Sequence, residues 1–432
     1  MTARSVGEAL RSAVGAERLL ADPSALAAAA IDGCVPRWVA RPRSPDHVAA
    51  VLAIAHDERL AVTPRGSGSS LGLGHPPARL DVVLDLRDLD AVVQYNPDDL
   101  TVTVQAGVTA GALSARLAPR RQWLPLDPLG GGTRTVGGVV ATNASGPLRA
   151  RYGAARDLLL GVRFVQADGV STWGGARVVK SVSGYDIPKL MVGSLGTLGV
   201  LVELTLRLHP MPEAEATLVA TFPAPGAVPA FVARVLDSPL SPNRLEVLNA
   251  AMLRACGLPS APAAVAVSVG SVEAVVQAAP AALTDMARAE RGESADAGDG
   301  FWRRYDAAMP VPAYPVVLKV GTLPSAIGET VREAERALGA GAVVAGGAVA
   351  GVVRIGVPAA PVTTIATAVA SLRAVVAPVD GSVVIERAPR DVREAVDPWG
   401  PVDGGAFAIM RALKTEFDPH GVLNPGRFVG GL

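Results

Sequence analysis

The sequence predicts an α+β protein built in two parts, and two observations support this prediction. Strand patterns and helix patterns occur along the whole chain, and the way they are arranged changes at His209-Pro210. Glycine-rich segments interrupt the first part, whereas strands and helices alternate regularly from Ala214 to about Pro389. With 432 residues, of which 50% are hydrophobic, the chain is long enough for two or three domains.

Composition argues against several kinds of partner and location. Basic and acidic residues both number 40, and no basic block indicates a nucleic acid partner. Cys34 and Cys256 lack metal-binding or CxxC spacing, which favours a reduced, cytoplasmic setting. The N-terminus lacks a signal peptide's apolar core, and the longest apolar run, Gly339–Val353, is too short for a membrane helix. We therefore expect strands in that run, no transmembrane segment, and membrane contact only through a partner.

Elements of the first part are predicted from apolar spacing and capping residues. Ser44-Pro45 is a typical helix start, and Val48, Val51, Leu52 and Ala55 after it fall on one face that should be buried. Strands are expected at Leu60–Thr63, Asp81–Leu86, Thr101–Gln105, Val162–Gln166, Val170–Trp173 and Val178–Lys180.

Two further patterns refine this part of the chain. Thr109 can cap a helix that runs to about Leu117, and Ala167-Asp168-Gly169 is a hairpin signal. The strand Thr101–Gln105 alternates as a half-exposed strand does. A later strand also alternates, with Val202, Leu204, Leu206 and Leu208 on one face and Glu203, Thr205 and Arg207 on the other.

The stretch Pro64–Gly74, PRGSGSSLGLG, is the strongest local indication of a ligand site. Glycines let the backbone approach a ligand closely, and successive exposed N–H groups with serine hydroxyls suit an anion such as a diphosphate. Arg65 is expected to add a fixed positive charge at the entrance. A flexible linker is the alternative interpretation, but the stretch is short and strand patterns flank it.

Two more segments have the composition of ligand-contacting loops. Leu124–Gly153 contains seven glycines and little regular pattern, and it could be a second ligand-wrapping segment. Gly193, Gly196 and Gly199 precede the later alternating strand and resemble a ligand-contacting turn.

The second part predicts one large sheet made of two β-α-β-like halves. Gly292–Gly300 is expected to be a surface loop, and a last helix is expected at Gly405–Phe417, followed by a turn at Asn424-Pro425-Gly426. Strands are predicted at Thr217–Phe222, Arg244–Leu248, Ala264–Val269, Pro315–Val320, Ala342–Ala345, Val352–Val357 and Ser382–Glu386. Helices are predicted at Val228–Leu236, Val272–Arg288, Ser325–Leu338 and Val362–Val375.

Five segments in this order resemble one family. They are PRGSGSSLGLG, TVGGVVATNASGP with the following RYG, RFVQADGV, VVKSVSGYDIPKLMVGSLGTLGVLVELTLRLHP and FDPHGVLNPGRF. Together they resemble the FAD-linked oxidases of the vanillyl-alcohol-oxidase type, which carry the para-cresol-methylhydroxylase (PCMH) type FAD domain. The likeness covers about residues 30–212 and the C-terminal tail.

The resemblance implies a domain organisation and a cofactor site. A helical segment at 1–30 would precede a two-subdomain FAD-binding domain at 31–212. An α+β cap with a large antiparallel sheet would follow at 213–390, and residues 391–432 would return to the FAD domain. The diphosphate would lie on Pro64, Arg65, Gly66, Ser67, Gly68, Ser69 and Ser70. The flavin, ribityl and adenosine parts would contact Thr135, Gly137, Gly138, Thr142, Asn143, Gly146, Gly193, Gly199, Val200, Asn424 and Arg427.

Within the family, the smaller FAD-binding subunit of the glycolate oxidase complex is the closest likeness. It implies a second FAD subunit and an iron–sulfur subunit as partners, and a small 2-hydroxy acid as the substrate of the complex. Some relatives bind FAD covalently through a histidine in the diphosphate loop. Because Ser69 stands near that position and His75 lies further on, we expect noncovalent FAD.

The catalytic groups are not evident from the sequence. Substrate-oxidising relatives carry an HxGDGNxH metal motif that this chain lacks, and we expect no metal. Solvent exposure is expected for His47 and His56, and a structural role for His75, which follows the glycine-rich stretch. His209 is expected to end a strand and His420 to lie in a turn. Tyr152, Tyr185, Arg303, Arg354 and Arg387 are conceivable active-site groups, although packing or surface roles are expected for each.

Three functional classes remain open at this point. The chain could be a flavoprotein subunit of a 2-hydroxy-acid dehydrogenase complex, or a free-standing FAD oxidoreductase. A scaffold protein that has lost FAD is the third class, and the intact Pro64–Gly74 stretch disfavours it. The missing metal motif favours the subunit interpretation.

Overall fold

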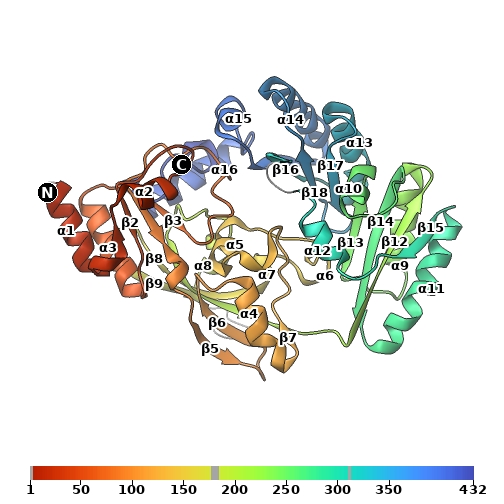
Figure 1. Cartoon of the computed structure of the whole chain (residues 1–432), viewed down its shortest axis with the longest axis horizontal. Helices are drawn as coiled ribbons and strands as arrows, with labels where there is room; N and C mark the ends of the chain where they lie inside the picture. The colour runs from red at the N-terminus through yellow and green to blue at the C-terminus, as the bar shows by residue number, and fades with distance from the viewer. Residues whose placement is uncertain (1–2, 177–183, 310–312) are drawn as a thin grey trace.

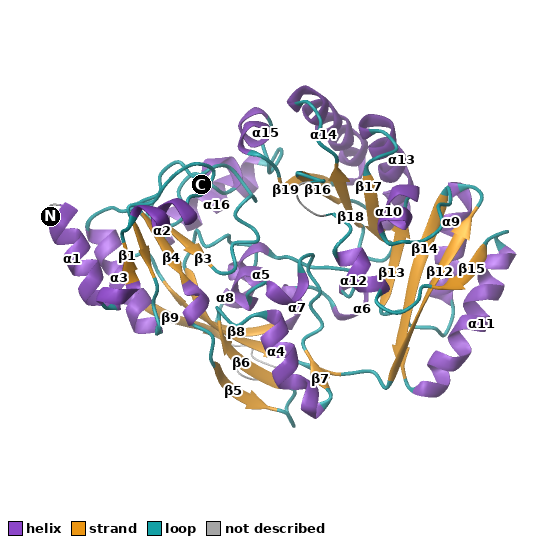
Figure 2. Ribbon diagram, viewed as in Figure 1, coloured by secondary structure: helices purple, strands orange, loops and turns teal. Residues whose placement is uncertain are grey.

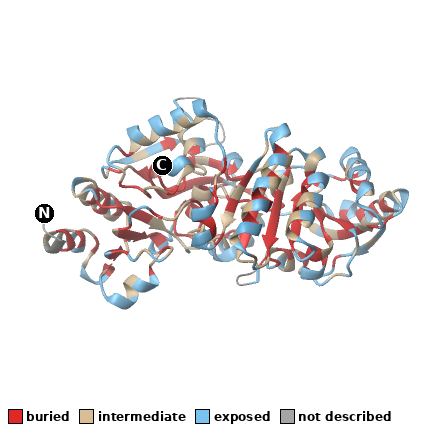
Figure 3. Ribbon diagram, turned by 90° about the horizontal axis from the view of Figure 1, so that it is seen from above, coloured by how far each residue is buried: buried red, intermediate tan, exposed pale blue. Residues whose placement is uncertain are grey.

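Two strand-rich lobes make up the protein, and the C-terminal segment joins the second back to the first (Figure 1). The computed structural model describes residues 3–176, 184–309 and 313–432. The predicted strand Val178–Lys180 lies outside the described residues. Strands of both lobes are buried beneath helices whose outer faces are exposed (Figure 3).

The first lobe begins with a small sheet in the order β1-β2-β4-β3, in which β2, β4 and β3 run parallel. Ser44 accepts the N–H of His47 at 3.2 Å and so caps α3, as the sequence predicts. The predicted apolar face of α3 is buried in the core beside this sheet, together with α1. The elements are α1 (Ala3–Val14), β1 (Leu19–Leu20), α2 (Pro23–Ala28), β2 (Trp38–Ala40), α3 (Pro45–Asp57), β3 (Val62–Arg65) and β4 (Val82–Asp85).

A five-stranded sheet in the order β5-β6-β10-β8-β9 completes the first lobe. The predicted hairpin is confirmed as β8 and β9, and Thr109 caps α4. The elements are β5 (Val92–Asn96), β6 (Thr101–Gln105), α4 (Ala110–Leu117), β7 (Gln122–Trp123), β8 (Leu159–Val165), β9 (Ser171–Gly175), α8 (Ile187–Met191), β10 (Val200–Arg207) and β11 (His209–Pro210).

The prediction that β6 is half-exposed is wrong. Thr101 and Thr103 are both 3% exposed, and Thr205 on the neighbouring strand β10 is 1% exposed. The hydroxyls of Thr103 and Thr205 lie 2.9 Å apart and hydrogen-bond each other, which allows polar side chains to be buried. The alternation of polar and apolar residues along these strands therefore does not indicate a solvent-exposed face, because both faces of the sheet are covered.

The expectation of little regular structure in Leu124–Gly153 is also wrong. This segment contains α5 (Val136–Thr142) and α6 (Arg149–Tyr152), and α7 (Ala155–Leu158) follows it. Thr135 caps α5 by accepting the N–H of Gly138 at 3.2 Å. Glycine and valine have low helix propensity, so the sequence gives little helical signal, and α5 depends on its cap and on tertiary packing.

The second lobe is one antiparallel sheet in the order β15-β12-β14-β13-β17-β18-β16-β19, with helices on both faces (Figure 2). It confirms the predicted large sheet. The strands are β12 (Ala214–Phe222), β13 (Arg244–Leu248), β14 (Ala263–Ser271), β15 (Glu293–Asp296), β16 (Val316–Gly321), β17 (Val343–Gly347), β18 (Val352–Val357) and β19 (Ser382–Arg387). The helices are α9 (Val228–Asp237), α10 (Ala250–Ala255), α11 (Glu273–Ala289), α12 (Phe301–Asp306), α13 (Ile327–Leu338) and α14 (Val362–Val376).

The edge strand β15 and the apolar helix α14 were not fully described by the sequence prediction. Residues 292–300 are not wholly a surface loop, because β15 forms a short polar edge strand on β12. Among the described residues, one apolar stretch, Val362–Val379 around α14, has the length and composition of a membrane span. Ile365, Val369 and Leu372 of α14 nevertheless pack into the core of this lobe.

The C-terminal segment returns to the first lobe, as predicted. It contains α15 (Arg390–Ala395) and α16 (Gly404–Phe417). Beyond α16, Leu423 forms a parallel bridge with Val62 of β3, and both side chains are fully buried. The tail therefore lies beside the strand that leads into Pro64–Gly74.

Candidate functional site

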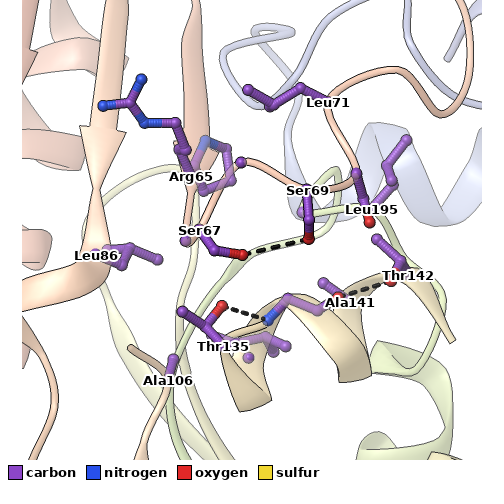
Figure 4. Close-up of a pocket in the computed structure, with 18 of the residues that line it drawn as sticks. Arg65, Ser67, Ser69, Leu71, Leu86, Ala106, Thr135, Ala141, Thr142 and Leu195 are labelled. Atoms are coloured by element: carbon purple, nitrogen blue, oxygen red, sulfur yellow. Dashed lines mark hydrogen bonds between the residues drawn. The ribbon is translucent and has the colours of Figure 1, made fainter. Parts of the chain in front are cut away.

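A pocket lies where the glycine- and serine-rich loop, α5, the turn before β10 and the C-terminal tail meet. We call it the glycine-loop pocket; it encloses about 720 Å³, including its open mouth (Figure 4). Its lining contains these predicted site residues: Pro64, Arg65, Gly66, Ser67, Gly68, Ser69, Ser70, Thr135, Gly137, Gly138, Thr142, Gly199, Asn424 and Arg427.

The loop offers free hydrogen-bond donors to a ligand. The N–H groups of Ser67, Gly68, Ser69 and Ser70 donate to no described residue. Gly68 has φ of +81°, a conformation that favours glycine. At Gly66, a Cβ atom would lie 2.1 Å from Oγ1 of Thr135, so only glycine lets the loop approach α5 this closely. A row of free N–H groups suits the oxygens of a diphosphate.

Arg65 is not the unpaired charge that the sequence suggests. Its guanidinium donates to Asp85 Oδ2 at 2.9 Å, and its side chain is directed away from α5 in Figure 4. Arg87 also donates to Asp85, at 2.7 and 2.9 Å. Burial alone would raise the pKa of Asp85, but the hydrogen bonds from Arg87 and Arg65 outweigh burial and lower that pKa. Arg65 therefore anchors the loop to β4.

The tail residues also hold the loop in place. Arg427 is 2% exposed, and its guanidinium donates to the carbonyls of Leu71, Leu73 and His75. Burial lowers the pKa of Arg427 to about 10. Asn424 bonds Thr63 and Leu195 through its side-chain amide. Both residues thus fix the backbone that surrounds the pocket.

Four predicted site residues do not line the glycine-loop pocket. Asn143 ends α5 in the left-handed conformation, and Gly146 packs against the backbone of Asp127. Gly193 lines a separate groove beside α16, and Val200 is fully buried on β10.

The pocket also has lining residues that the sequence analysis did not select. They are the apolar residues Leu71, Leu86, Ala106, Ala141, Leu195 and Leu201. Gly196 of the predicted ligand-contacting turn also lines the pocket, as expected. In a sequence, such apolar residues cannot be distinguished from core residues.

A second cavity opens from the glycine-loop pocket toward the second lobe. We call it the arginine chamber; it encloses about 1050 Å³, including open solvent, and shares Ser69, Ser70 and Thr142 with the glycine-loop pocket. Its charged lining residues come from α12, β18, β19 and the loop before α5, and they are Arg134, Asp306, Arg354, Glu386 and Arg387. A ligand in this chamber would lie next to a ligand in the glycine-loop pocket.

An ion pair forms one wall of the chamber. Arg354 Nε lies 3.1 Å from Glu386, and Lys319 Nζ lies 3.9 Å from the same carboxylate. Burial alone would raise the pKa of Glu386, but the charges of Arg354 and Lys319 lower it. Burial lowers the pKa of Lys319. Glu386 is therefore an ionised carboxylate engaged by two cations.

The other two arginines have no carboxylate partner among the described residues. Arg387 donates to the carbonyls of Met309 and Tyr314 at 2.9 and 2.7 Å, and its Nε–H is buried with no described partner. Arg134 donates to the carbonyl of Leu129 at 2.7 Å and to Ser70. Three guanidinium groups thus face two carboxylates in the chamber, which favours binding of an anion.

Asp306 is the carboxylate of the chamber that is free of ion pairs within the described part of the chain. It accepts the backbone N–H of Gly130 at 2.8 Å, and burial raises its pKa. A carboxylate with a raised pKa is a stronger base than an ordinary one.

The fold places two of the five conceivable active-site residues in the chamber and the other three elsewhere. Arg354 and Arg387 both line the chamber, while they also bond protein carbonyls or a carboxylate as packing residues do. Tyr152 packs between the rings of Trp123 and His209, Tyr185 is 91% exposed and Arg303 is exposed.

Two of the histidines pair with the C-terminal segment. His75 Nε2 lies 3.3 Å from Asp397 Oδ1, consistent with a structural role. His56 is not simply solvent-exposed as expected, because its ring lies 4.4 Å from that of His420 and its Nδ1 is buried.

The glycine-loop pocket fits FAD by the chemistry of its lining. Free N–H groups and serine hydroxyls suit the diphosphate, and apolar residues such as Leu86, Ala106 and Leu201 suit flat aromatic rings. The fold and this pocket thus define a protein that binds FAD in its first lobe.

Two family models match parts of the chain. Residues 36–174 match the FAD binding domain family, and residues 401–428 match the C-terminal domain of FAD-linked oxidases. The first lobe therefore carries an FAD binding domain, and the tail is similar to that of FAD-linked oxidases.

Several relatives named for hydroxy acids resemble the chain. It is 36% identical over 224 residues to a probable mitochondrial D-lactate dehydrogenase of Danio rerio, 32% over 215 residues to the glycolate oxidase subunit GlcD of Bacillus subtilis, and 38% over 220 residues to a D-2-hydroxyglutarate dehydrogenase of Xanthomonas citri. These matches cover 51%, 50% and 49% of this chain and 45%, 46% and 46% of the relatives, so the chain spans about half the length of the curated relatives it matches.

Solved structures share the fold over nearly the whole chain. P-cresol methylhydroxylase has a TM-score of 0.78 at 15% identity, covering 98% of this chain and 96% of that structure. An alkyldihydroxyacetonephosphate synthase has a TM-score of 0.75 at 16% identity, covering 99% of this chain and 86% of that structure. These similarities confirm the predicted two-subdomain FAD-binding fold with a cap.

Proposed function

We propose that this protein oxidises a small 2-hydroxy acid, with FAD in the glycine-loop pocket and the acid in the arginine chamber. The observation that carries the proposal is the position of the chamber: it adjoins the glycine-loop pocket and contains three guanidinium groups against two carboxylates. D-lactate, glycolate and D-2-hydroxyglutarate, for which the relatives are named, each carry a carboxylate beside a hydroxyl.

The residues of the chamber supply the binding and proton-transfer groups that this reaction needs. Bound FAD supplies the hydride acceptor. Arg387 and Arg134 both line the chamber, and their guanidinium groups can hold the carboxylate of the acid. Asp306 accepts the hydroxyl proton, because it forms no ion pair with a described residue and burial raises its pKa despite the nearby charges of Arg134 and Arg354.

We further propose that the chain works as the FAD-binding subunit of a 2-hydroxy-acid dehydrogenase complex. In this proposal a second FAD subunit and an iron–sulfur subunit are its partners, and the complex is cytoplasmic or bound to a membrane through those partners. Similarity to GlcD supports a multi-subunit context. The absence of an HxGDGNxH motif from the sequence supports dependence on a partner.

A free-standing FAD oxidoreductase is the second candidate. It is favoured by the chamber itself, since anion-binding arginines and a candidate proton acceptor all come from this one chain. Under this alternative the substrate is an alcohol or hydroxy acid that the isolated protein oxidises without partners.

Stopped-flow mixing of the FAD-loaded chain with glycolate or D-lactate, without oxygen, separates these candidates. The subunit proposal expects slow loss of the flavin absorbance that partner subunits accelerate. Fast, saturable bleaching of the isolated chain would make the free-standing enzyme correct. If no hydroxy acid alters the flavin spectrum in either setting, the proposed oxidation of 2-hydroxy acids is wrong.

A further inference from the structure

Arg387 enters the arginine chamber from an apolar part of its wall. On β16, Val317 is the cross-strand partner of Arg387. The guanidinium of Arg387 donates to the carbonyl of Met309, and a Cβ atom added to Gly72 would lie 3.6 Å from Cγ of Arg387. Leu73, which follows Gly72, lines the chamber together with Met309 and Val317. The end of the chamber that presents Arg387 therefore also presents apolar side chains.

The guanidinium of Arg387 keeps a donor group for a ligand. Its two described hydrogen bonds both leave from Nη2, to the carbonyls of Met309 and Tyr314 at 2.9 and 2.7 Å. No described residue accepts from Nη1, and Nη1, unlike Nε, is not one of the buried side-chain atoms that lack a partner. Nη1 is therefore accessible, and a carboxylate bound there would be held beside Met309.

The apolar wall is suited to an uncharged group. Leu73 and Met309 are 7% exposed and Val317 is 4% exposed, so most of each side chain packs against protein and the remainder borders the chamber. Leu129 and Ala307 extend this lining. Covering such a surface with an apolar group releases water, whereas a charged group would lose its hydration there without gaining a partner.

The charges of the chamber leave two arginines for a ligand. Arg354 lies 3.1 Å from Glu386, and Lys319, outside the lining, lies 3.9 Å from the same carboxylate. Arg134 and Arg387 have no carboxylate partner among the described residues, and their guanidinium groups can hold one ligand carboxylate. A second carboxylate on the same ligand would meet apolar side chains or groups that are already ion-paired.

We propose that the chamber selects 2-hydroxy acids that carry one carboxylate and an apolar side chain such as isobutyl, and that it discriminates against dicarboxylates. The carboxylate binds Arg387, and the side chain of the acid covers Met309 and Val317. This inference rests on the proposed oxidation of a 2-hydroxy acid and names the substrate class. D-2-hydroxyglutarate, for which one relative is named, carries a second carboxylate and belongs to the disfavoured class.

Three acids without a hydrogen on the hydroxyl carbon test this inference by isothermal titration calorimetry of the full-length, FAD-loaded protein. 2-Hydroxy-2-methylpropanoate presents the carboxylate and the hydroxyl with methyl groups only. 2-Hydroxy-2,4-dimethylpentanoate replaces one methyl group by isobutyl. 2-Hydroxy-2-methylbutanedioate has a carboxylate in place of the isopropyl end of that isobutyl group. None can transfer a hydride from the hydroxyl carbon, so binding is measured whether or not oxidation needs partner subunits.

The three affinities should differ in a fixed order. The isobutyl acid should bind at least about tenfold more tightly than 2-hydroxy-2-methylpropanoate, because its added isopropyl group leaves water. The dicarboxylate should bind at least about tenfold more weakly than the isobutyl acid, because its second carboxylate meets the apolar wall.

Two variants of similar side-chain size locate the binding site of the isobutyl group. Met309→Gln and Val317→Thr each place a polar group in the wall, so they should weaken binding of the isobutyl acid about three- to tenfold and leave that of 2-hydroxy-2-methylpropanoate unchanged. Met211→Gln, at a 40% exposed position outside the chamber, is the matched control and should bind all three acids as wild type does. Melting temperatures identify any variant that fails to fold, and the order of affinities in wild type decides the proposal without the variants.

Failure of this inference is distinguishable from failure of the proposed function. If 2-hydroxy-2-methylpropanoate binds but the isobutyl acid binds no more tightly, or the dicarboxylate binds as tightly as the isobutyl acid, the inference is wrong and the proposed function stands. Unchanged affinity for the isobutyl acid in folded Met309→Gln and Val317→Thr would also overturn it. If none of the three acids binds, the proposed function is wrong, and this inference with it.

Discussion

The Thr63 hydroxyl donates a hydrogen bond to the side-chain oxygen of Asn424 at 2.9 Å, although 361 residues separate them in the sequence. The amide nitrogen of Asn424 also donates to the carbonyl of Leu195 at 2.6 Å. One tail residue thus joins β3, which leads into the glycine loop, to the turn that precedes β10. The cofactor site is therefore closed by the end of the chain.

Asn424→Ala should destabilise the protein and weaken FAD binding together. The hydroxyl of Thr63 and the carbonyl of Leu195 would lose buried partners, at about 1–3 kcal/mol for each group left unpaired. Thermal unfolding with and without added FAD measures both effects. Asn96→Ala on β5, which does not line the pocket, should leave FAD affinity unchanged. Normal FAD affinity in Asn424→Ala would show that the tail does not shape the site.

Gly68→Val should abolish FAD binding without unfolding the second lobe. Gly68 has φ of +81°, which valine rarely adopts, and its side chain would disturb the free N–H groups of the loop. Gly298→Val is the matched control, because Gly298 has φ of +69° and a Cβ added there would meet nothing within 4 Å. The control should suffer similar backbone strain and keep its flavin. A flavin-loaded Gly68→Val protein would contradict the assignment of the diphosphate site.

FAD should be released completely when the protein is precipitated with acid. No histidine, cysteine or tyrosine is among the described residues that line the glycine-loop pocket, so a covalent link to the flavin has no nucleophile there. His75 lies outside that lining and is near Asp397, at 3.3 Å. Absorbance of the supernatant and the washed pellet measures the release. Flavin that stays with the pellet would disprove noncovalent binding.

Glu246 should make stability fall as pH rises. Burial raises its pKa to about 8, and Tyr305 donates a hydrogen bond to it at 2.7 Å. The folded state then binds more protons than the unfolded state between about 4.5 and 8, and each pH unit in this window removes about 1.4 kcal/mol per proton.

Glu246→Gln removes this titration while keeping an acceptor for Tyr305. Denaturant unfolding across the window should therefore give a flatter pH dependence than in wild type. The free energy of unfolding of the variant, minus that of wild type, should therefore be more favourable above pH 8 than at pH 5. An unchanged slope would show that Glu246 does not titrate in this range.

Local sequence signals predicted much of the fold. Ser44 and Thr109 cap helices through contacts within three residues, so their roles can be inferred from a few neighbouring letters. The strands Arg244–Leu248 and Val352–Val357 have the predicted bounds, because short segments rich in valine, leucine and isoleucine are recognised without distant information. The glycine loop was also evident, since its composition is locally unusual.

The chamber could not be predicted in the same way. Arg354 lies on β18, yet its guanidinium reaches the carbonyl of Ser145, which is 209 residues earlier in the chain. An arginine within an apolar strand has the same local pattern whether it faces solvent, packs, or binds a ligand.

The most direct test of the account is a titration of the FAD-loaded protein with 2-hydroxy-2-methylpropanoate, followed by flavin absorbance. This acid has the carboxylate and hydroxyl of a substrate but no hydrogen on the hydroxyl carbon, so it binds without being oxidised. If the arginine chamber binds the acid, a saturable spectral change is expected that weakens at least about tenfold in Arg387→Gln and is unchanged in Arg332→Gln, at an exposed position of α13. No spectral change in wild type, or equal affinity in a folded Arg387→Gln protein, would contradict the assignment of the arginine chamber as the acid-binding site.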